Sequence, residues 1–236
     1  MIRTPRPAIP LVALHPDARL RKLDFSSVLF LDIDGVLHLE GCEPHDHFCF
    51  APAFCEKMRS IDPERALPIV ITSMWRHTYM IEELRSNFSQ PVASQIVGVT
   101  PNFAKINPER LRALTLKINA LSGVSSRPAY RQIEVMDWMT DNAPSGRWLA
   151  IDDRAEYFEE GCRDLFVVKL KTVEEGAWAQ DTWSTLINGV QTRAFAAADT
   201  PIQFTHMAER ITRFRDTALR DGNLHEAPEN RRSPRP

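Results

Sequence analysis

The sequence predicts an α/β fold built on a central, mainly parallel five-stranded sheet with helices on both faces, a three-layer arrangement. Short apolar runs alternate along the chain with segments of helical periodicity, which is typical of parallel strands joined by crossover helices. The apolar runs are continuous rather than alternating, as expected for strands that are covered on both faces. The 236 residues, of which 43 % are apolar, suffice for one globular domain with appendages.

The expected strands are short and rich in Val, Ile, Leu and Phe, as buried strands are. They span residues 28–33, 67–72, 95–99, 148–151 and 165–170. The segments between them have the length and periodicity of helices. These expected helices span residues 52–60, 78–87, 108–121, 131–142, 154–160 and 177–189.

Both ends of the chain predict appendages to a main domain over residues 24–190. Prolines and arginines interrupt residues 1–23, which we expect to form an N-terminal arm. Residues 191–222 should hold a C-terminal helix that begins at Thr200-Pro201 and stops at Gly222. Its apolar stripe predicts docking on the domain, with a dimer face as the alternative. Residues 223–236 have the composition of a disordered tail.

Charge and composition narrow the class of protein. The formal net charge of −2 gives no overall basic footprint for nucleic acid. No apolar run approaches the length of a membrane helix, and the proline-interrupted N-terminus does not resemble a signal peptide. Four cysteines do not make a disulfide scaffold in a chain of this length. We therefore expect a cytoplasmic, reduced protein without a membrane partner, while the oligomeric state stays open.

Two carboxylates, Asp32 and Asp34, follow the first expected strand. One residue separates them, so both side chains should point the same way. Two anions held so close need a metal ion, a proton or a cation. The alternative is a loop with two solvated acids, in which Gly35 serves only the turn.

Polar side chains also end two other strands of the expected sheet. Thr72 and Ser73 end the second strand, and Asp152 and Asp153 end the fourth. Ligands in such folds bind beyond the carboxyl ends of the strands, where these groups should meet. Acids from two strands can hold a hard divalent ion such as Mg²⁺. A hydroxyl and a guanidinium, such as that of Arg131, can hold the oxygens of a phosphoryl group.

Five stretches of this sequence together resemble a known family. The chain is similar to the haloacid dehalogenase (HAD) superfamily and, over residues 28–176, to the HAD domain of Swiss Army Knife RNA-repair-like proteins. The resemblance implies a Rossmann-like HAD fold and a Mg²⁺-dependent phosphohydrolase, a phosphatase acting on a phosphorylated substrate. The link to RNA repair comes from the family and not from a residue of this chain. The stretches are FLDIDGVLH, IVITSMWR, VGVTP, RQIEVMDWM and WLAIDD.

The resemblance also implies roles for the four acids. Asp32 would be the nucleophile that forms an aspartyl phosphate. Asp34 would act as general acid and then as general base, and its backbone carbonyl would bind the metal. Asp153 would be the third metal ligand, and Asp152 would bridge to the metal or orient its ligands. The reverse assignment of these two residues stays open.

The remaining roles fall on hydroxyl and basic side chains. Thr72 would hydrogen-bond a phosphoryl oxygen, with Ser73 as the alternative. Arg131 would balance the nucleophile, where the family more commonly has lysine. Arg76 would either touch substrate or form a solvated helix start. Three other basic residues stay possible in place of Arg131, namely Lys105, Lys117 and Arg127.

The chain has no room for the cap domain with which many HAD phosphatases select small substrates. Residues 36–50 can hold a β-hairpin flap, and residues 101–130 form a small basic insert. An open site suits large substrates such as nucleic-acid ends or phosphoproteins. Residues 101–131 carry six basic side chains and one acidic side chain, which would attract polyanions or else form a solvated helix face. The alternative function is a non-catalytic phosphate-binding or nucleic-acid repair accessory module.

A second cluster of ligand-type residues lies in the stretch CEPHDHFC. Cys42, His45, His47 and Cys49 are residue types that bind zinc. Their spacing is tighter than in a zinc finger, and packing or substrate contact in the flap is the alternative.

Overall fold

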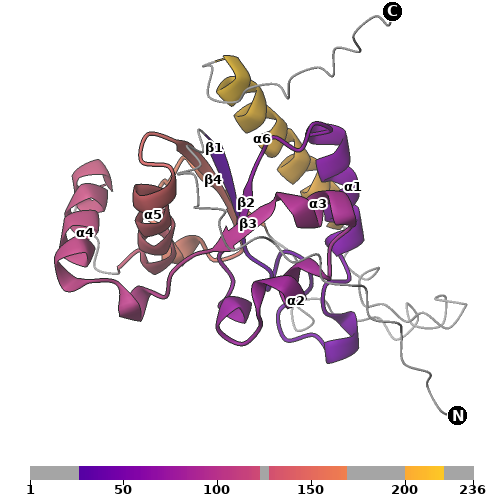
Figure 1. Cartoon of the computed structure of the whole chain (residues 1–236), viewed down its shortest axis with the longest axis horizontal. Coiled ribbons are helices and arrows are strands. Elements are labelled where there is room, and N and C mark those ends of the chain that lie inside the picture. The colour runs from indigo at the N-terminus through magenta and orange to yellow at the C-terminus, as the bar shows by residue number, and fades with distance from the viewer. Residues whose placement is uncertain (1–26, 123–127, 169–199, 221–236) are drawn as a thin grey trace, which may run out of the picture.

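The computed structural model describes residues 27–122, 128–168 and 200–220. Its core is a five-stranded sheet in the order β3-β2-β1-β4-β5, and all four strand pairs are parallel (Figure 1). The predicted α/β class and the central five-stranded sheet are confirmed. The strands are β1 (Ser27–Leu31), β2 (Ile69–Ile71), β3 (Ile96–Val99), β4 (Arg147–Asp152) and β5 (Leu165–Val167).

Helices cover both faces of the sheet (Figure 1). Helices α1 (Ala51–Ile61) and α6 (Thr200–Arg220) share one core with Leu29 and Leu31 of β1. The alternate residues of β1 pack in a second core with α5 (Tyr130–Asn142), which in turn carries α4 (Pro108–Ser122) on its outer side. Every residue of β1 is fully buried, which explains its unbroken apolar sequence.

The C-terminal helix α6 packs on the domain through its apolar stripe. The buried side chains belong to Phe204, Met207, Ile211, Phe214 and Ala218. Arg215 adds an ion pair, with its Nε 3.1 Å from Asp62 Oδ1. Docking, one of the two predicted alternatives for this stripe, is therefore what the structure shows.

Several elements differ from the predictions. A short helix, α3 (Gln90–Gln95), precedes β3 where no element was predicted, and Pro91 lies in its first turn, a position that proline favours. Only α2 (Ile81–Arg85) forms within the expected helix 78–87, and the 3₁₀ turn η2 (Met74–His77) precedes it.

Two expected elements are shorter or irregular. The expected helix 154–160 is only the 3₁₀ turn η4 (Ala155–Tyr157), since Asp152 Oδ1 accepts the Arg154 N–H and fixes a turn there. Residues 36–50 occupy the expected place of the flap, but they form turns and the 3₁₀ helix η1 (Pro44–Asp46) rather than hairpin strands. A further 3₁₀ turn, η3 (Phe103–Lys105), precedes α4.

Three sequence predictions lie outside the described residues: the arm at 1–23, the helix at 177–189 and the tail at 223–236. All four cysteines are described, and none forms a disulfide. Among the described helices, none combines the length and the apolar character that crossing a bilayer requires.

Candidate active site

Three carboxylates meet at the edge of the sheet where β1 and β4 end. These strands pair in parallel with Leu31 opposite Ile151, so the residues that follow, Asp32 and Asp152, lie at the same level. One carboxylate oxygen each of Asp32, Asp152 and Asp153 lies within 4.8 Å of the other two. The acidic ends of the first and fourth strands, which the sequence places far apart, therefore form one cluster.

Burial makes this cluster electrostatically costly. Asp32 is 3 % exposed and Asp152 is 1 % exposed. Burial raises the pKa of both carboxyl groups, and the pKa of Asp152 lies well above its ordinary value. Burial and the neighbouring Asp32 carboxylate also raise the pKa of Asp153 to about 6. The cluster would accept positive charge, as a proton or a metal ion.

The shape and chemistry of the cluster suit a hard divalent cation. Its donors are all carboxylate oxygens, the ligands that Mg²⁺ prefers. Asp152 Oδ2 is buried and has no hydrogen-bond partner among the described residues. Gly35, at φ +67°, leaves the space in which Asp153 lies, because a Cβ there would be 2.2 Å from Asp153 Oδ2. This glycine therefore does more than form the turn.

Arg131 brings a cation to the same cluster from the first turn of α5. Its Nη1 lies 3.6 Å from Asp32 Oδ1, and its Nε lies 3.7 Å from Asp152 Oδ2. Nη1 also donates a hydrogen bond to the carbonyl of Thr72, and the guanidinium stacks over the ring of Tyr157 at 5.8 Å. The alternatives Lys105 and Lys117 are exposed side chains of η3 and α4, and Arg127 lies outside the described residues. Arg131 is thus the predicted cation that reaches Asp32.

The Asp34 side chain is not part of the three-acid group. Its Oδ1 accepts hydrogen bonds from Trp75 Nε1 at 2.9 Å and from His38 Nε2 at 3.0 Å. His38 Nδ1 accepts the N–H of Phe48, so the ring proton lies on Nε2. Although burial acts to raise it, the hydrogen bonds from His38 and Trp75 hold the pKa of Asp34 below its ordinary value. The predicted metal contact of the Asp34 backbone carbonyl stays a prediction.

Ser73 contacts both Asp34 and Asp32. Its hydroxyl donates to Asp34 Oδ2 at 3.5 Å and also acts on Asp32, whose pKa it lowers against the stronger effect of burial. Thr72, one residue earlier, is buried and gives its carbonyl to Arg131. Ser73 therefore contacts the aspartates through its hydroxyl, whereas Thr72 contacts Arg131 through its backbone carbonyl.

Comparison with known families agrees with this geometry. A family model described as the HAD domain in Swiss Army Knife RNA repair proteins matches residues 28–174, more than half of the chain. The chain belongs to this HAD family. No curated protein and no solved structure matches it. The match covers the three acids, Ser73 and Arg131, so the cluster lies inside the HAD domain.

Arg76 of this HAD domain requires a correction. Of the two predictions, the solvated helix start is wrong because the side chain is 1 % exposed, and the substrate contact stays a prediction. Its guanidinium pairs with Glu134 at 2.7 Å and donates to the carbonyls of Ser73 at 2.7 Å and Thr100 at 3.1 Å. Arg76 therefore ties the ends of β2 and β3 to α5.

Ion pairs in the folded domain involve part of the positive charge of residues 101–131. Arg110 of α4 pairs with Asp137 and Asp141 of α5, and Arg131 is buried in the acidic cluster. Three basic side chains of the insert are exposed in its described part: Lys105, Arg112 and Lys117.

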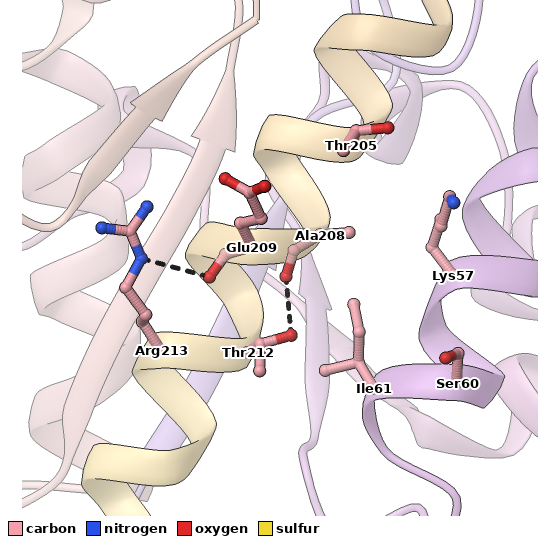
Figure 2. Close-up of a pocket in the computed structure, with 8 residues that line it drawn as sticks. All are labelled: Lys57, Ser60, Ile61, Thr205, Ala208, Glu209, Thr212 and Arg213. Carbon is pink, nitrogen blue, oxygen red and sulfur yellow. Dashed lines mark hydrogen bonds between the residues drawn. The ribbon is translucent and has the colours of Figure 1, made fainter.

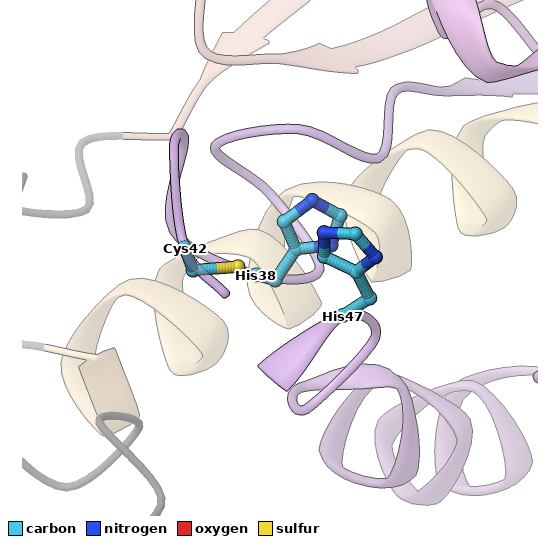
Figure 3. Close-up of side chains that lie close together, drawn as sticks. All are labelled: His38, Cys42 and His47. Carbon is cyan, nitrogen blue, oxygen red and sulfur yellow. The ribbon is translucent and has the colours of Figure 1, made fainter. Parts of the chain in front are cut away.

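The predicted zinc ligands do not form one group. His45 is 73 % exposed, and Cys49 is not among the three neighbouring ligand atoms. The group that does form contains Cys42, His47 and His38, the last of which the sequence prediction missed (Figure 3).

Proposed function

We propose that this HAD domain is a Mg²⁺-dependent phosphohydrolase that works through an aspartyl phosphate on Asp32. The observation that carries the proposal is the position of Asp32, a buried carboxylate that lies against Arg131 and beside two further carboxylates. A nucleophile that attacks an anion needs such compensating positive charge.

In the first step, an Asp32 oxygen bonds to the phosphorus and the bond from phosphorus to the leaving oxygen breaks. Arg131 stabilises the charge on the phosphoryl oxygens, and Ser73 or Thr72 donates a hydrogen bond to one of them. The contacts of Ser73 with both aspartates favour Ser73 for this position. The three carboxylates and the Asp34 carbonyl would hold Mg²⁺, which when bound neutralises the carboxylates and phosphoryl oxygens.

Asp34 would move the protons in both steps. It gives a proton to the leaving oxygen, and it then takes a proton from the water that releases phosphate from Asp32. Its side chain is 38 % exposed, so an incoming substrate can reach it. The lowered pKa keeps Asp34 ionised in the free protein, so Asp34 must take up a proton from solvent or substrate before it can act as the acid of the first step.

The substrate class follows from what surrounds the cluster. Within residues 27–122 and 128–168, no cap domain is inserted between the motifs. The turn η3, which holds exposed Lys105, contacts α5 through the Phe103 N–H and Glu134. The description of the matching family names RNA repair proteins. We therefore propose a large phosphorylated substrate, with a terminal phosphate of nucleic acid as the first to test.

The test is hydrolysis of p-nitrophenyl phosphate with Mg²⁺ by the full chain and by Asp32→Asn, with Asp141→Asn as an exposed control. We expect turnover that needs Mg²⁺, that Asp32→Asn abolishes, and that the control retains. Denaturing quench with a labelled phosphorylated substrate should trap an acyl phosphate that hydroxylamine cleaves. Turnover that survives Asp32→Asn would refute the proposal. A phosphorylated panel without turnover, but with retained oligonucleotide binding, would instead support the accessory module.

A further inference from the structure

A second group of metal-ligand side chains lies between the end of β1 and the start of α1. One nitrogen or sulfur atom each of His38, Cys42 and His47 lies within 4.8 Å of the other two. Figure 3 shows the thiol and both imidazoles gathered in one place. The acidic cluster offers only carboxylate oxygen, whereas this group offers two imidazoles and a thiol.

These donor types select a different class of metal ion from the acidic cluster. Thiolate and imidazole bind Zn²⁺ and other late first-row metals, whereas Mg²⁺ needs oxygen. Three protein ligands leave a fourth position for water or for a carboxylate. Asp34 Oδ1, 3.0 Å from His38 Nε2, is the nearest such carboxylate that the hydrogen bonds identify.

The packing holds the three ligands in place without a metal. The His38 ring is 2 % exposed, and its centroid is 5.1 Å from that of His47. Trp75 contacts both rings, with centroids 5.5 Å from His38 and 4.7 Å from His47. A turn at Gly41, with φ +70°, returns the chain so that Cys42 lies over His38. The site is therefore preorganised, which reduces the entropic cost of binding.

A buried carboxyl group in the same turn is a separate indication of a cation. Asp46 is 2 % exposed, and neither carboxylate oxygen has a hydrogen-bond partner in the described part of the chain. An ionised carboxylate in such surroundings is costly unless positive charge lies near. Asp46 precedes His47 directly and acts on it electrostatically. Exposed His45 lies beside Asp46, with its Nε2 3.7 Å from Asp46 Oδ2, and a divalent ion held by His47 would add further positive charge next to this carboxyl group.

We propose that His38, Cys42 and His47 bind one Zn²⁺ ion at a site distinct from the Mg²⁺ site. Cys42 binds as the thiolate, so its proton leaves to solvent when the metal enters. One His38 nitrogen exchanges its present hydrogen bond, to Phe48 or to Asp34, for the metal. The metal bond is the stronger of the two.

The test uses the full chain with its affinity tag removed, freed of metal by a chelator and then titrated with Zn²⁺ alone. We expect one ion per chain by equilibrium dialysis. Co²⁺ in place of Zn²⁺ should show the thiolate-to-cobalt charge-transfer absorption. Cys42→Ser and His47→Gln should each weaken binding more than about tenfold, and Cys42→Ser should also remove the absorption. Both native residues are only partly buried, and circular dichroism of the metal-free variants checks their fold.

Two neighbours in the same segment are matched controls. Cys49→Ser and His45→Gln should bind Zn²⁺ like the native chain, since neither residue belongs to the group. Asp32→Asn should also retain binding, which separates this result from the fate of the phosphohydrolase proposal. Absence of binding by the native chain would overturn the site, as would an unchanged absorption in folded Cys42→Ser. Equal losses in the Cys49 and His45 variants would overturn the ligand assignment in favour of the four-residue loop set.

A groove of about 440 Å³ lies between α1 and α6 (Figure 2). It is lined by mixed charge, including Lys57, Glu209 and Arg213. Nothing in the structure indicates what would occupy it, and it carries no proposal.

Discussion

Arg131 Nη1 lies 3.6 Å from Asp32 Oδ1, and the two side chains are 6 % and 5 % exposed. A buried carboxylate beside other carboxylates would otherwise take up a proton. Arg131 is the nearest described cation to Asp32, and it lowers the pKa that burial raises. The same guanidinium bonds the Thr72 carbonyl, so it joins α5 to the end of β2 as well as to the acids.

Replacing Arg131 by methionine should remove both effects. We expect p-nitrophenyl phosphate turnover to fall by at least about 100-fold, because the positive charge at the nucleophile is lost. The free energy of unfolding should fall by about 3 kcal/mol, since Asp32 is left buried without its cation. Steady-state kinetics measures the turnover, and urea denaturation measures the free energy of unfolding. Arg131→Lys should recover part of both, and a fully active Arg131→Met variant would contradict the role.

Gly35 and Gly41 allow a matched test of the acidic cluster. Both have positive φ, +67° and +70°, so an alanine is similarly strained at either position. A Cβ at Gly35 would lie 2.2 Å from Asp153 Oδ2, whereas a Cβ at Gly41 meets nothing within 4 Å. Gly35→Ala should therefore weaken Mg²⁺ activation of turnover by about tenfold or more. Gly41→Ala should leave Mg²⁺ activation unchanged and lower stability by about 1 kcal/mol. Equal Mg²⁺ dependence in both variants would show that Asp153 does not serve the metal.

The raised pKa of Asp153 should make the metal-free protein depend on pH. Burial and Asp32 raise this pKa from 3.8 to about 6, so the folded state binds the proton more tightly than the unfolded chain. The resulting stabilisation is complete below pH 3.8 and is lost as pH rises through about 6. Asp153→Asn should reduce the loss of stability across that window by about 2 kcal/mol. Denaturation of both proteins in chelator, below pH 3.8 and above pH about 6, measures the change in the free energy of unfolding. The same pH dependence of stability in Asp153→Asn and in the native chain would contradict the raised pKa.

Mg²⁺ should act at the same carboxylates in competition with protons. We expect Mg²⁺ to raise the melting temperature of the native chain above pH about 7 and to have little effect below pH about 5. Asp152→Asn should abolish the increase. Exposed Asp141→Asn is the control and should keep it.

Arg76 should matter for stability rather than for substrate binding. Arg76→Met leaves Glu134, which is 8 % exposed, without its partner, and should cost about 3 kcal/mol or more. The double variant with Glu134→Leu should recover part of that loss, which a double-mutant cycle measures by urea denaturation. Arg112→Met, on the exposed side of α4, should change stability by less than about 0.5 kcal/mol. A raised KM with native stability would instead restore the substrate role predicted from the sequence.

Substitutions of the two hydroxyl residues after β2, Thr72 and Ser73, should affect turnover to different extents. Ser73→Ala should lower turnover by about 10- to 100-fold, because its hydroxyl is the one beside Asp32 and Asp34. Thr72→Val should change turnover less, since the Thr72 carbonyl that binds Arg131 is retained. The reverse order of effects would assign the phosphoryl contact to Thr72.

The sequence alone determined the sheet and the residues at its carboxyl edge. Continuous apolar runs such as that of β1 reflect burial on both faces, and this signal is local. The acids that follow β1 and β4 could be placed together because parallel strands carry their carboxyl ends to one edge. Arg131, at the start of α5, could be assigned to the same edge through the resemblance to the HAD family.

Only the tertiary structure decided which neighbours each side chain meets. The burial of Arg76 depends on Glu134 and on the Thr100 carbonyl, which come from distant parts of the chain. His38 joins Cys42 and His47 because of how the chain turns after β1, and spacing along the sequence does not record that turn. Local patterns report the periodicity of burial, whereas these contacts depend on the path by which the chain returns on itself.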